Sequence, residues 1–287
     1  MTSQAKPRLG RGLAAAGASL ACTFLLVYGP ALIGSLRGPQ QFLAVRIVSV
    51  LLVVLLVRAV LAPLLGVSVS DLGLATNGRT LLRGGLGVLV GAAVLTLAFC
   101  VAWGAGGLVV IGGSASSGAA LVAMELTTFV VGALFEELTF RVGLVGVLRL
   151  VLPPPLAIGM SAAVFGLLHA TNPGATTVAV TNTALAGVLL GLLFVERNGA
   201  PRLPSLGLCT GFHIGWNVMQ NQVLGIPVSG FAGHSRALFV EAQDVAWSGG
   251  SYGLEAGWGA TLALAVACVW AARRADLSTP SWAPSGS

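Results

Sequence analysis

Residues 42–65 form the run FLAVRIVSVLLVVLLVRAVLAPLL, which decides the class of fold. The charged residues within it are Arg46 and Arg58, and the others are almost all apolar. A helix of about 20 apolar residues matches the roughly 30 Å thickness of the hydrocarbon core of a bilayer. We therefore expect this run to span a membrane as a helix.

The rest of the chain has the same character. Charged residues make up 8% of its 287 residues, against about 25% in soluble domains, and the mean hydropathy is +0.92. A chain of this composition cannot cover a soluble surface. We expect an all-α, polytopic transmembrane helix bundle of about eight spans. Their expected positions are Leu13–Ile33, Phe42–Leu65, Leu86–Trp103, Ala119–Leu150, Leu156–Ala170, Thr177–Val195, Leu206–Leu224 and Leu254–Ala272.

Lys and Arg are distributed unevenly between the segments that join these spans. Basic residues beside a span are retained on the cytoplasmic side. With eight spans and the N-terminus inside, the outer loops hold only Arg37 and Arg236. We therefore expect both the N-terminus and the C-terminus to be cytoplasmic. The basic residues on the inner side would be Lys6, Arg8, Arg11, Arg79, Arg83, Arg149, Arg197, Arg202, Arg273 and Arg274.

The net charge of +6 does not indicate a nucleic-acid-binding protein. The basic residues are spread singly between apolar runs, and they form no cluster with aromatic residues. No nucleic-acid partner is expected. The expected partners are membrane lipids and a peptide or protein substrate at the membrane.

Three ionisable residues, Glu136, Glu137 and Arg141, lie within an otherwise apolar run. An ionisable side chain at the centre of a bilayer costs at least about 2.5 kcal/mol unless it is paired or hydrated. Glu137 and Arg141 are four residues apart and can pair on one helical face, whereas Glu136 points about 100° away. The spacing predicts a structural Glu137 and an available Glu136.

Further polar side chains follow in later runs: His169, and then His213 with Asn217 on one helical face. Three prolines at 153–155 predict the turn of a helical hairpin between Glu136 and His169. Both residues are about 21 Å along their helices from this turn, at 1.5 Å per residue. We expect them to meet at one depth, with His213 close enough to converge on them.

A carboxylate, two imidazoles and an amide in a membrane cavity suit hydrolysis. They would supply a base for water, a proton shuttle and donors for an oxyanion. The same residue types also fit a proton-coupled transporter, or a structural polar network that joins three helices. The residue types alone favour hydrolysis over these two readings without excluding them.

The motifs resemble those of a known family. Glu136-Glu137-Leu-Thr-Phe-Arg141 resembles an EExxxR motif, Phe165 to His169 resembles FxxxH, and His213-Ile-Gly-Trp-Asn217 resembles HxxxN. These three motifs, in this order, are typical of the CPBP family, which comprises CAAX prenyl proteases and bacterial Abi-type membrane proteases.

The resemblance implies an intramembrane endopeptidase. In that reading Glu136 and His169 activate a water for attack on a peptide carbonyl, and His213 and Asn217 stabilise the tetrahedral oxyanion. The alternative functions are a non-catalytic, Abi-like immunity or interaction protein and, less favoured, a polytopic transporter. The residues expected to support the site are Glu137, Arg141 and Phe165.

No metal is expected to be required, because a water activated by Glu and His needs no ion. Zinc or another divalent cation is the alternative cofactor. Glu136, His169 and His213 would form the two-histidine, one-glutamate set of catalytic zinc sites, with water as the fourth ligand. The expected enzyme is therefore a peptidase of either glutamate or metal-dependent type.

The resemblance also suggests how the chain is divided. Residues 1–117 would hold N-terminal transmembrane helices and an amphipathic connector, residues 118–230 the catalytic helix core, and residues 231–287 an outer loop, the last transmembrane helix and a disordered tail. Since the chain has one Lys beside 14 Arg, it hints at a GC-rich bacterial genome. The expected location is the bacterial plasma membrane, with several passes.

Overall fold

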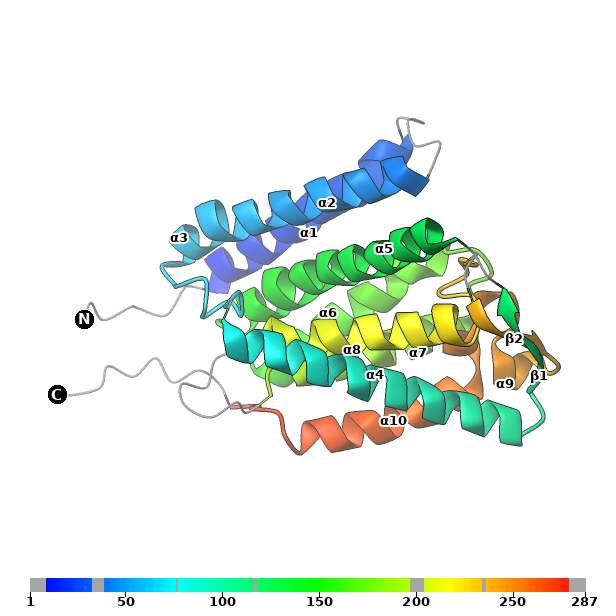
Figure 1. Ribbon diagram of the computed structural model, residues 1–287. Helices are drawn as coiled ribbons and strands as arrows, with labels where there is room; N and C mark the ends of the chain where they lie inside the picture. Colours follow the sequence, from blue (N-terminus) through cyan, green and yellow to red (C-terminus); the bar gives the residue numbers. More distant parts are fainter. Residues whose placement is uncertain are drawn as a thin grey trace.

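The computed structural model describes residues 9–32, 39–75, 77–115, 118–196, 204–233 and 236–278 (Figure 1). Some of the basic residues from which the orientation in the membrane was predicted lie outside these ranges. Residues 279–287, the last part of the expected tail, also lie outside them. The basic residues outside the described ranges are Lys6, Arg8, Arg37, Arg197 and Arg202.

The fold is mostly helical. The N-terminal part consists of α1 (Leu9–Leu32), α2 (Pro39–Leu56), which continues through the π-helix η1 (Val57–Leu61) into α3 (Ala62–Leu65), and α4 (Gly78–Gly104). α1 and α2 pack against each other along one side of the bundle (Figure 1).

The remaining helices surround the residues that were expected to carry the chemistry. They are α5 (Ala119–Glu137), the π-helix η2 (Leu138–Gly146), α6 (Pro154–Leu168), the 3₁₀ turn η3 (His169–Thr171), α7 (Thr177–Phe194), α8 (Leu206–Val218), the π-helix η4 (Met219–Val223) and α10 (Trp258–Ala272). Short helical turns precede α10: α9 (Val245–Ser248), η5 (Gly250–Tyr252) and η6 (Leu254–Ala256).

A small antiparallel sheet corrects the all-α expectation. β1 (Leu108–Ala115) pairs with β2 (Arg236–Ala242), from Leu108 opposite Ala242 to Ala115 opposite Arg236, with an irregularity between Val110 and Gly112. The sheet lies at the end of the bundle away from both termini (Figure 1). It joins two loops far apart in sequence, so the local pattern of neither loop predicts it.

Five helical segments among the described residues are long and apolar enough to cross a membrane, so the chain is a membrane protein. Eight spans and two cytoplasmic termini stay predictions. α10 is apolar but shorter than these five. The five segments are Leu43–Leu65, Gly78–Gly104, Ala119–Gly146, Pro154–Thr171 and Thr177–Phe194.

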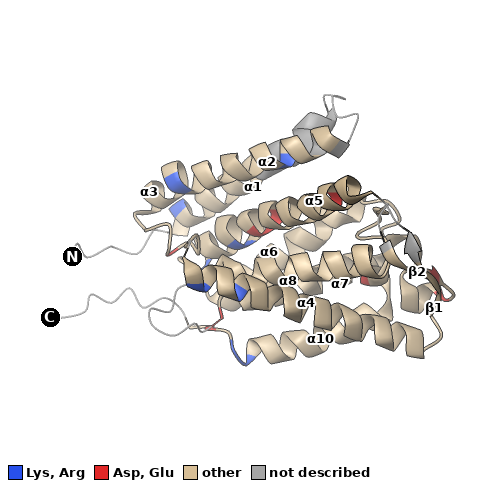
Figure 2. Cartoon of the chain, viewed as in Figure 1, with Lys and Arg blue, Asp and Glu red and all other residues tan. Residues whose placement is uncertain are grey.

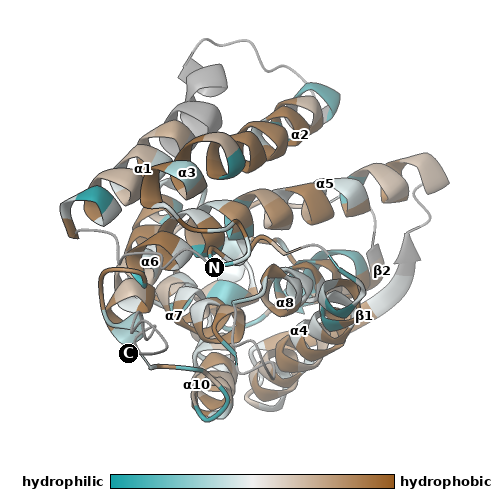
Figure 3. Cartoon of the chain, turned by 90° about the vertical axis from the view of Figure 1, so that its left-hand side faces the viewer, coloured by the Kyte–Doolittle hydropathy of each residue, from teal (hydrophilic) through white to brown (hydrophobic). Residues whose placement is uncertain are grey.

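The hydropathy of the surface agrees with a lipid environment. In Figure 3 the outer helices α2, α5 and α6 are mostly brown, the colour of hydrophobic residues. Large apolar side chains such as Leu51, Leu55 and Leu89 are exposed. In water such a surface would be an aggregation liability, whereas in a bilayer it faces acyl chains.

One of the expected boundaries differs from the structure. α4 begins at Gly78 rather than Leu86, because the Asn77 side chain accepts a hydrogen bond from the Thr80 N–H at 3.0 Å and caps the helix. In the expected amphipathic connector before it, Leu72 and Leu74 are buried in the core.

The expected disordered tail is also partly wrong. Ala275 is buried and forms a β-bridge with Glu196, and the Asp276 N–H donates to the Val195 carbonyl at 2.8 Å. The chain is therefore packed against the end of α7 for several residues beyond α10.

Glycines allow α8 to lie directly against α4. A Cβ atom on Gly207, Gly211 or Gly215 of α8 would overlap a backbone oxygen of α4, and one on Gly87 or Gly91 of α4 would overlap α8. Small residues permit this close backbone approach in membrane helices. α8 carries His213 and Asn217, so this packing fixes the position of half of the candidate site.

Candidate active site

The two adjacent glutamates at the end of α5 have different surroundings. Glu137 and Arg141 are completely buried, and Arg141 Nε lies 3.0 Å from Glu137 Oε2. Glu136 stays partly exposed, with 24% of its side-chain surface accessible. The expected pairing of Glu137 with Arg141 is thereby confirmed.

A π-helix starts directly after these glutamates. The long expected span Ala119–Leu150 is resolved into α5, the π-helix η2 and a turn before Pro153. π-Helical turns are rare and often occur at functional sites. Here the change of helix type falls between Glu137 and Arg141 and sets the orientation of the fully buried pair.

His213 lies between the two glutamates. Its Nδ1 is 2.9 Å from Glu137 Oε1, and its Nε2 is 3.8 Å from Glu136 Oε2. The first distance is that of a hydrogen bond and the second is longer than one. An ionised carboxylate can only accept, so Nδ1 carries a proton and donates it to Glu137. Nε2 then faces Glu136, and a proton between these two groups would be stabilised by both.

His169 has a defined tautomer as well. Its Nδ1 is 2.8 Å from the backbone oxygen of Phe165. Because a carbonyl oxygen only accepts, Nδ1 is the protonated nitrogen and Nε2 is the acceptor when the ring is neutral. Nε2 of His169 can therefore accept a hydrogen bond from water.

Phe165 supports this arrangement. Its ring centroid lies 4.6 Å from that of His169 and 5.0 Å from that of Phe140, and the Arg141 guanidinium carbon is 4.9 Å from the same centroid. Phe165 is buried, and its ring lies beside both the guanidinium of Arg141 and the imidazole of His169.

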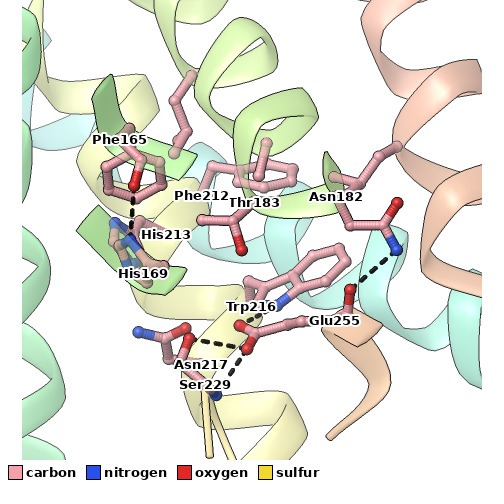
Figure 4. A pocket seen from close by; sticks show the side chains of 13 residues that line it. Phe165, His169, Asn182, Thr183, Phe212, His213, Trp216, Asn217, Ser229 and Glu255 are labelled. Atoms are coloured by element: carbon pink, nitrogen blue, oxygen red, sulfur yellow. Dashed lines mark hydrogen bonds between the residues drawn. The ribbon is translucent and has the colours of Figure 1, made fainter. Parts of the chain in front are cut away.

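A cavity lies between α6, α7, α8 and the segment before α10 (Figure 4). Its volume is about 50 Å³, measured as space for the centres of water molecules, and one water needs roughly 10–15 Å³ on that measure. Glu136 does not line the cavity. Its Oε2 lies 3.8 Å from Nε2 of His213, which does line it. The lining residues are Phe165, His169, Asn182, Thr183, Ala186, Leu190, Phe212, His213, Trp216, Asn217, Ser229, Glu255 and Leu264.

Sequence reasoning missed Glu255. Its Oε1 accepts a hydrogen bond from Trp216 Nε1 at 3.2 Å, and its Oε2 accepts from the Ser229 N–H at 2.6 Å and the Ser229 hydroxyl at 2.8 Å. The signal was present in the sequence, because Glu255 is the carboxylate within the last expected span, Leu254–Ala272.

The alternative metal set is not assembled. Within the described ranges, no group of three or more His, Cys, Asp or Glu side chains is placed to hold a metal ion. Both ring nitrogens of His213 face glutamates, and Nδ1 of His169 is used by a carbonyl. The two-histidine, one-glutamate ligand set of Glu136, His169 and His213 is therefore not confirmed and stays a prediction.

A comparison with known protein families finds a match over the part of the chain that carries the candidate site. Residues 118–219 match the family model described as type II CAAX prenyl endopeptidase Rce1-like. The resemblance to the CPBP family is thereby confirmed over this segment. The Rce1-like segment contains all three motifs, from Glu136 to Asn217, and ends before Ser229 and Glu255. No curated protein and no solved structure shows a significant match.

Proposed function

We propose that this chain is an intramembrane endopeptidase of glutamate type, which hydrolyses a peptide bond of a membrane-associated protein or peptide. The observation that carries the proposal is the position of His213 between Glu136 and Glu137, next to a cavity with room for water. The Rce1-like match supports a peptidase. We assign it to the plasma membrane of a bacterial cell.

In the proposed reaction Glu136 takes one proton from a water molecule while His169 Nε2 accepts a hydrogen bond from the other. The water oxygen attacks the peptide carbonyl carbon and forms a tetrahedral oxyanion. Glu136 then returns its proton to the leaving amine as the C–N bond breaks. His169 takes the second proton when the new carboxyl group ionises.

His213 and Asn217 would stabilise the oxyanion. The two residues are one turn apart on α8 and line the cavity together. A protonated imidazole and a side-chain amide are both donors, and donors already in place stabilise a developing negative charge without reorganisation. Glu137 and Arg141 would act indirectly, because the hydrogen bond from His213 Nδ1 to Glu137 orients the imidazole ring.

The test is a comparison of membrane and secreted peptides from cells that express the wild type or Glu136→Gln at equal levels. Peptides released by the wild type are expected to disappear in the variant, because the amide cannot accept the proton from water. Glu125→Gln is the matched control, since Glu125 lies on the same helix and accepts a hydrogen bond from Gln222 at 2.8 Å.

Three results would count against the proposal. An active Glu136→Gln variant would remove Glu136 as the base. A cellular phenotype that survives Glu136→Gln, with no released peptide in either strain, would favour the non-catalytic, Abi-like role. Solute flux in liposomes without any cleaved product would favour a transporter.

A further inference from the structure

Open space lies beside Gly132 of α5, a residue that is not part of the three motifs. A Cβ atom built on this glycine would have no neighbour within 4 Å. The contact between α8 and α4 is the opposite case, because a Cβ atom on Gly211 would overlap the Gly84 carbonyl oxygen. Gly132 therefore does not serve close helix packing, and the direction in which it points decides what the space can hold.

Gly132 lies on the face of α5 that carries Glu136. Successive residues of a helix are 100° apart, so Gly132 is about 40° from Glu136 around the axis and about 6 Å from it along the axis. Beyond the first turn, the exposed side chains of α5 are Ala123, Thr127 and Val130. These three residues lie between about 140° and 180° from Gly132. The space beside Gly132 therefore faces the interior of the bundle and not the outer surface of α5.

Two contacts place α8 and the π-helix η4 opposite this face of α5. Nε2 of His213 lies 3.8 Å from Oε2 of Glu136. About 16 Å further along α5, Glu125 Oε2 accepts a hydrogen bond from Gln222 Nε2 of η4 at 2.8 Å. Glu125 lies about 20° from Gly132 around the axis. The helices therefore run antiparallel, and the space beside Gly132 lies between the two contacts.

Asn217 lies level with Gly132 on the other side of this space. Gly132 precedes Glu136 by four residues, and Asn217 follows His213 by the same number. Because the helices are antiparallel, both steps lead about 6 Å away from the contact between Glu136 and His213, in the same direction. Asn217 is 8% exposed and lines the cavity. Among the described residues, no group forms a hydrogen bond with its side chain, so the space adjoins a buried amide that is available to a ligand.

We propose that the space beside Gly132 receives a large apolar side chain of the substrate, which makes Gly132 a specificity-determining residue. The inference rests on the proposed function. An extended chain rises about 3.3 Å per residue, so about 6 Å corresponds to two residues. The side chain that enters the space therefore belongs to a residue about two positions from the carbonyl that is attacked at Glu136.

The surroundings of Gly132 favour an apolar side chain. Thr128 and Phe129 flank it one turn away on α5, and both are partly buried. The Thr128 hydroxyl donates to the Met124 carbonyl at 2.9 Å, so its proton is used within the helix. The Asn217 amide is assigned to the oxyanion in the proposed reaction. A charged substrate side chain would have to enter a membrane span without a partner, which is unfavourable.

The experiment compares Gly132→Leu with Gly159→Leu in liposomes. The probe is a set of peptides with one apolar membrane-spanning segment, in which each position in turn is Ala or Phe. Mass spectrometry identifies the cut bond and measures the rate for each peptide. Gly159 of α6 is the matched control, because a Cβ atom there also has no neighbour within 4 Å, while the residue is exposed and does not line the cavity.

We expect the wild type to cleave peptides with Phe two residues from the cut bond at least about tenfold more efficiently than those with Ala there, because the large side chain is buried. Gly132→Leu should lower kcat/KM for the Phe peptides at least about tenfold and leave the Ala peptides within about twofold, since the added side chain fills the space. Gly132→Ala should fall between, and Gly159→Leu should keep the wild-type preference.

Two outcomes overturn the inference. If the wild type cleaves the probe but has no preference for Phe, or if Gly132→Leu keeps that preference or slows all peptides equally, the space receives no substrate side chain and the proposed peptidase function stands. If the wild type does not cleave more than Glu136→Gln, the proposed function and the inference fail together. Thermal unfolding in detergent identifies a variant that has not folded, and Gly132→Ala then carries the comparison, because its methyl group meets no neighbour.

Discussion

Adjacent residues on one helix can have opposite roles, as Glu136 and Glu137 illustrate. Glu137 is fully buried and binds both Arg141 and His213, whereas Glu136 is partly exposed and faces His213 Nε2. The roughly 100° between successive residues of a helix is enough to separate them. This separation could be predicted from sequence, because it depends only on local helix geometry.

Removing the charge of Arg141 should destabilise the protein strongly. Arg141→Met would leave the Glu137 carboxylate buried without its cation, which typically costs about 3–5 kcal/mol. We expect a lower midpoint of thermal unfolding in detergent. Glu137→Gln combined with Arg141→Met should recover part of the loss, since the uncompensated charge is then absent. An unfolding midpoint of Arg141→Met equal to that of the wild type would contradict a structural ion pair.

At the scale of elements, the packing of α4 against α8 holds the site together. The helices themselves follow from their apolar sequences, but the partner of each helix does not. Sequence analysis placed a division at residue 117, between α4 and the expected core, and that division remains a prediction. The glycine contacts nevertheless place α4, which precedes this division, directly against α8, which follows it.

Adding one methyl group at this contact should separate the two helices. In Gly211→Ala the new Cβ would overlap the Gly84 carbonyl oxygen, and overpacking of this kind costs about 1–3 kcal/mol. Gly85→Ala is the matched control, because a Cβ there has no neighbour within 4 Å. Ala favours a helix over Gly by about 1 kcal/mol, so the control should be as stable as the wild type or more stable. Equal unfolding midpoints for both variants would argue against the close packing.

On the scale of the whole molecule, the charges separate the two ends of the bundle. Figure 2 shows basic residues mostly towards the end that holds both termini. Arg83 there pairs with Glu196, and Arg149 donates to the Asp71 carbonyl. The cavity lies towards the other end, near β1 and β2, because His169 follows α6 and Glu255 precedes α10.

This arrangement predicts that substrates reach the cavity from the non-cytoplasmic side. The basic end should be cytoplasmic. A green fluorescent protein fused after residue 287 should fluoresce, and alkaline phosphatase fused after Gly106, at the cavity end, should be active. The reverse pattern would place the cavity in the cytoplasmic half and would overturn the expected orientation of the termini.

The sequence by itself determined the membrane environment, the approximate helices, the motif order and the pairing of Glu137 with Arg141. These features depend on composition and on spacing within one helix. Only the tertiary structure decided that His213 lies between two glutamates, that a sheet joins β1 to β2, and that Glu255 faces the same cavity. Those contacts join residues from distant segments, and their distances depend on how helices pack through glycine contacts and loops. No local periodicity encodes that information.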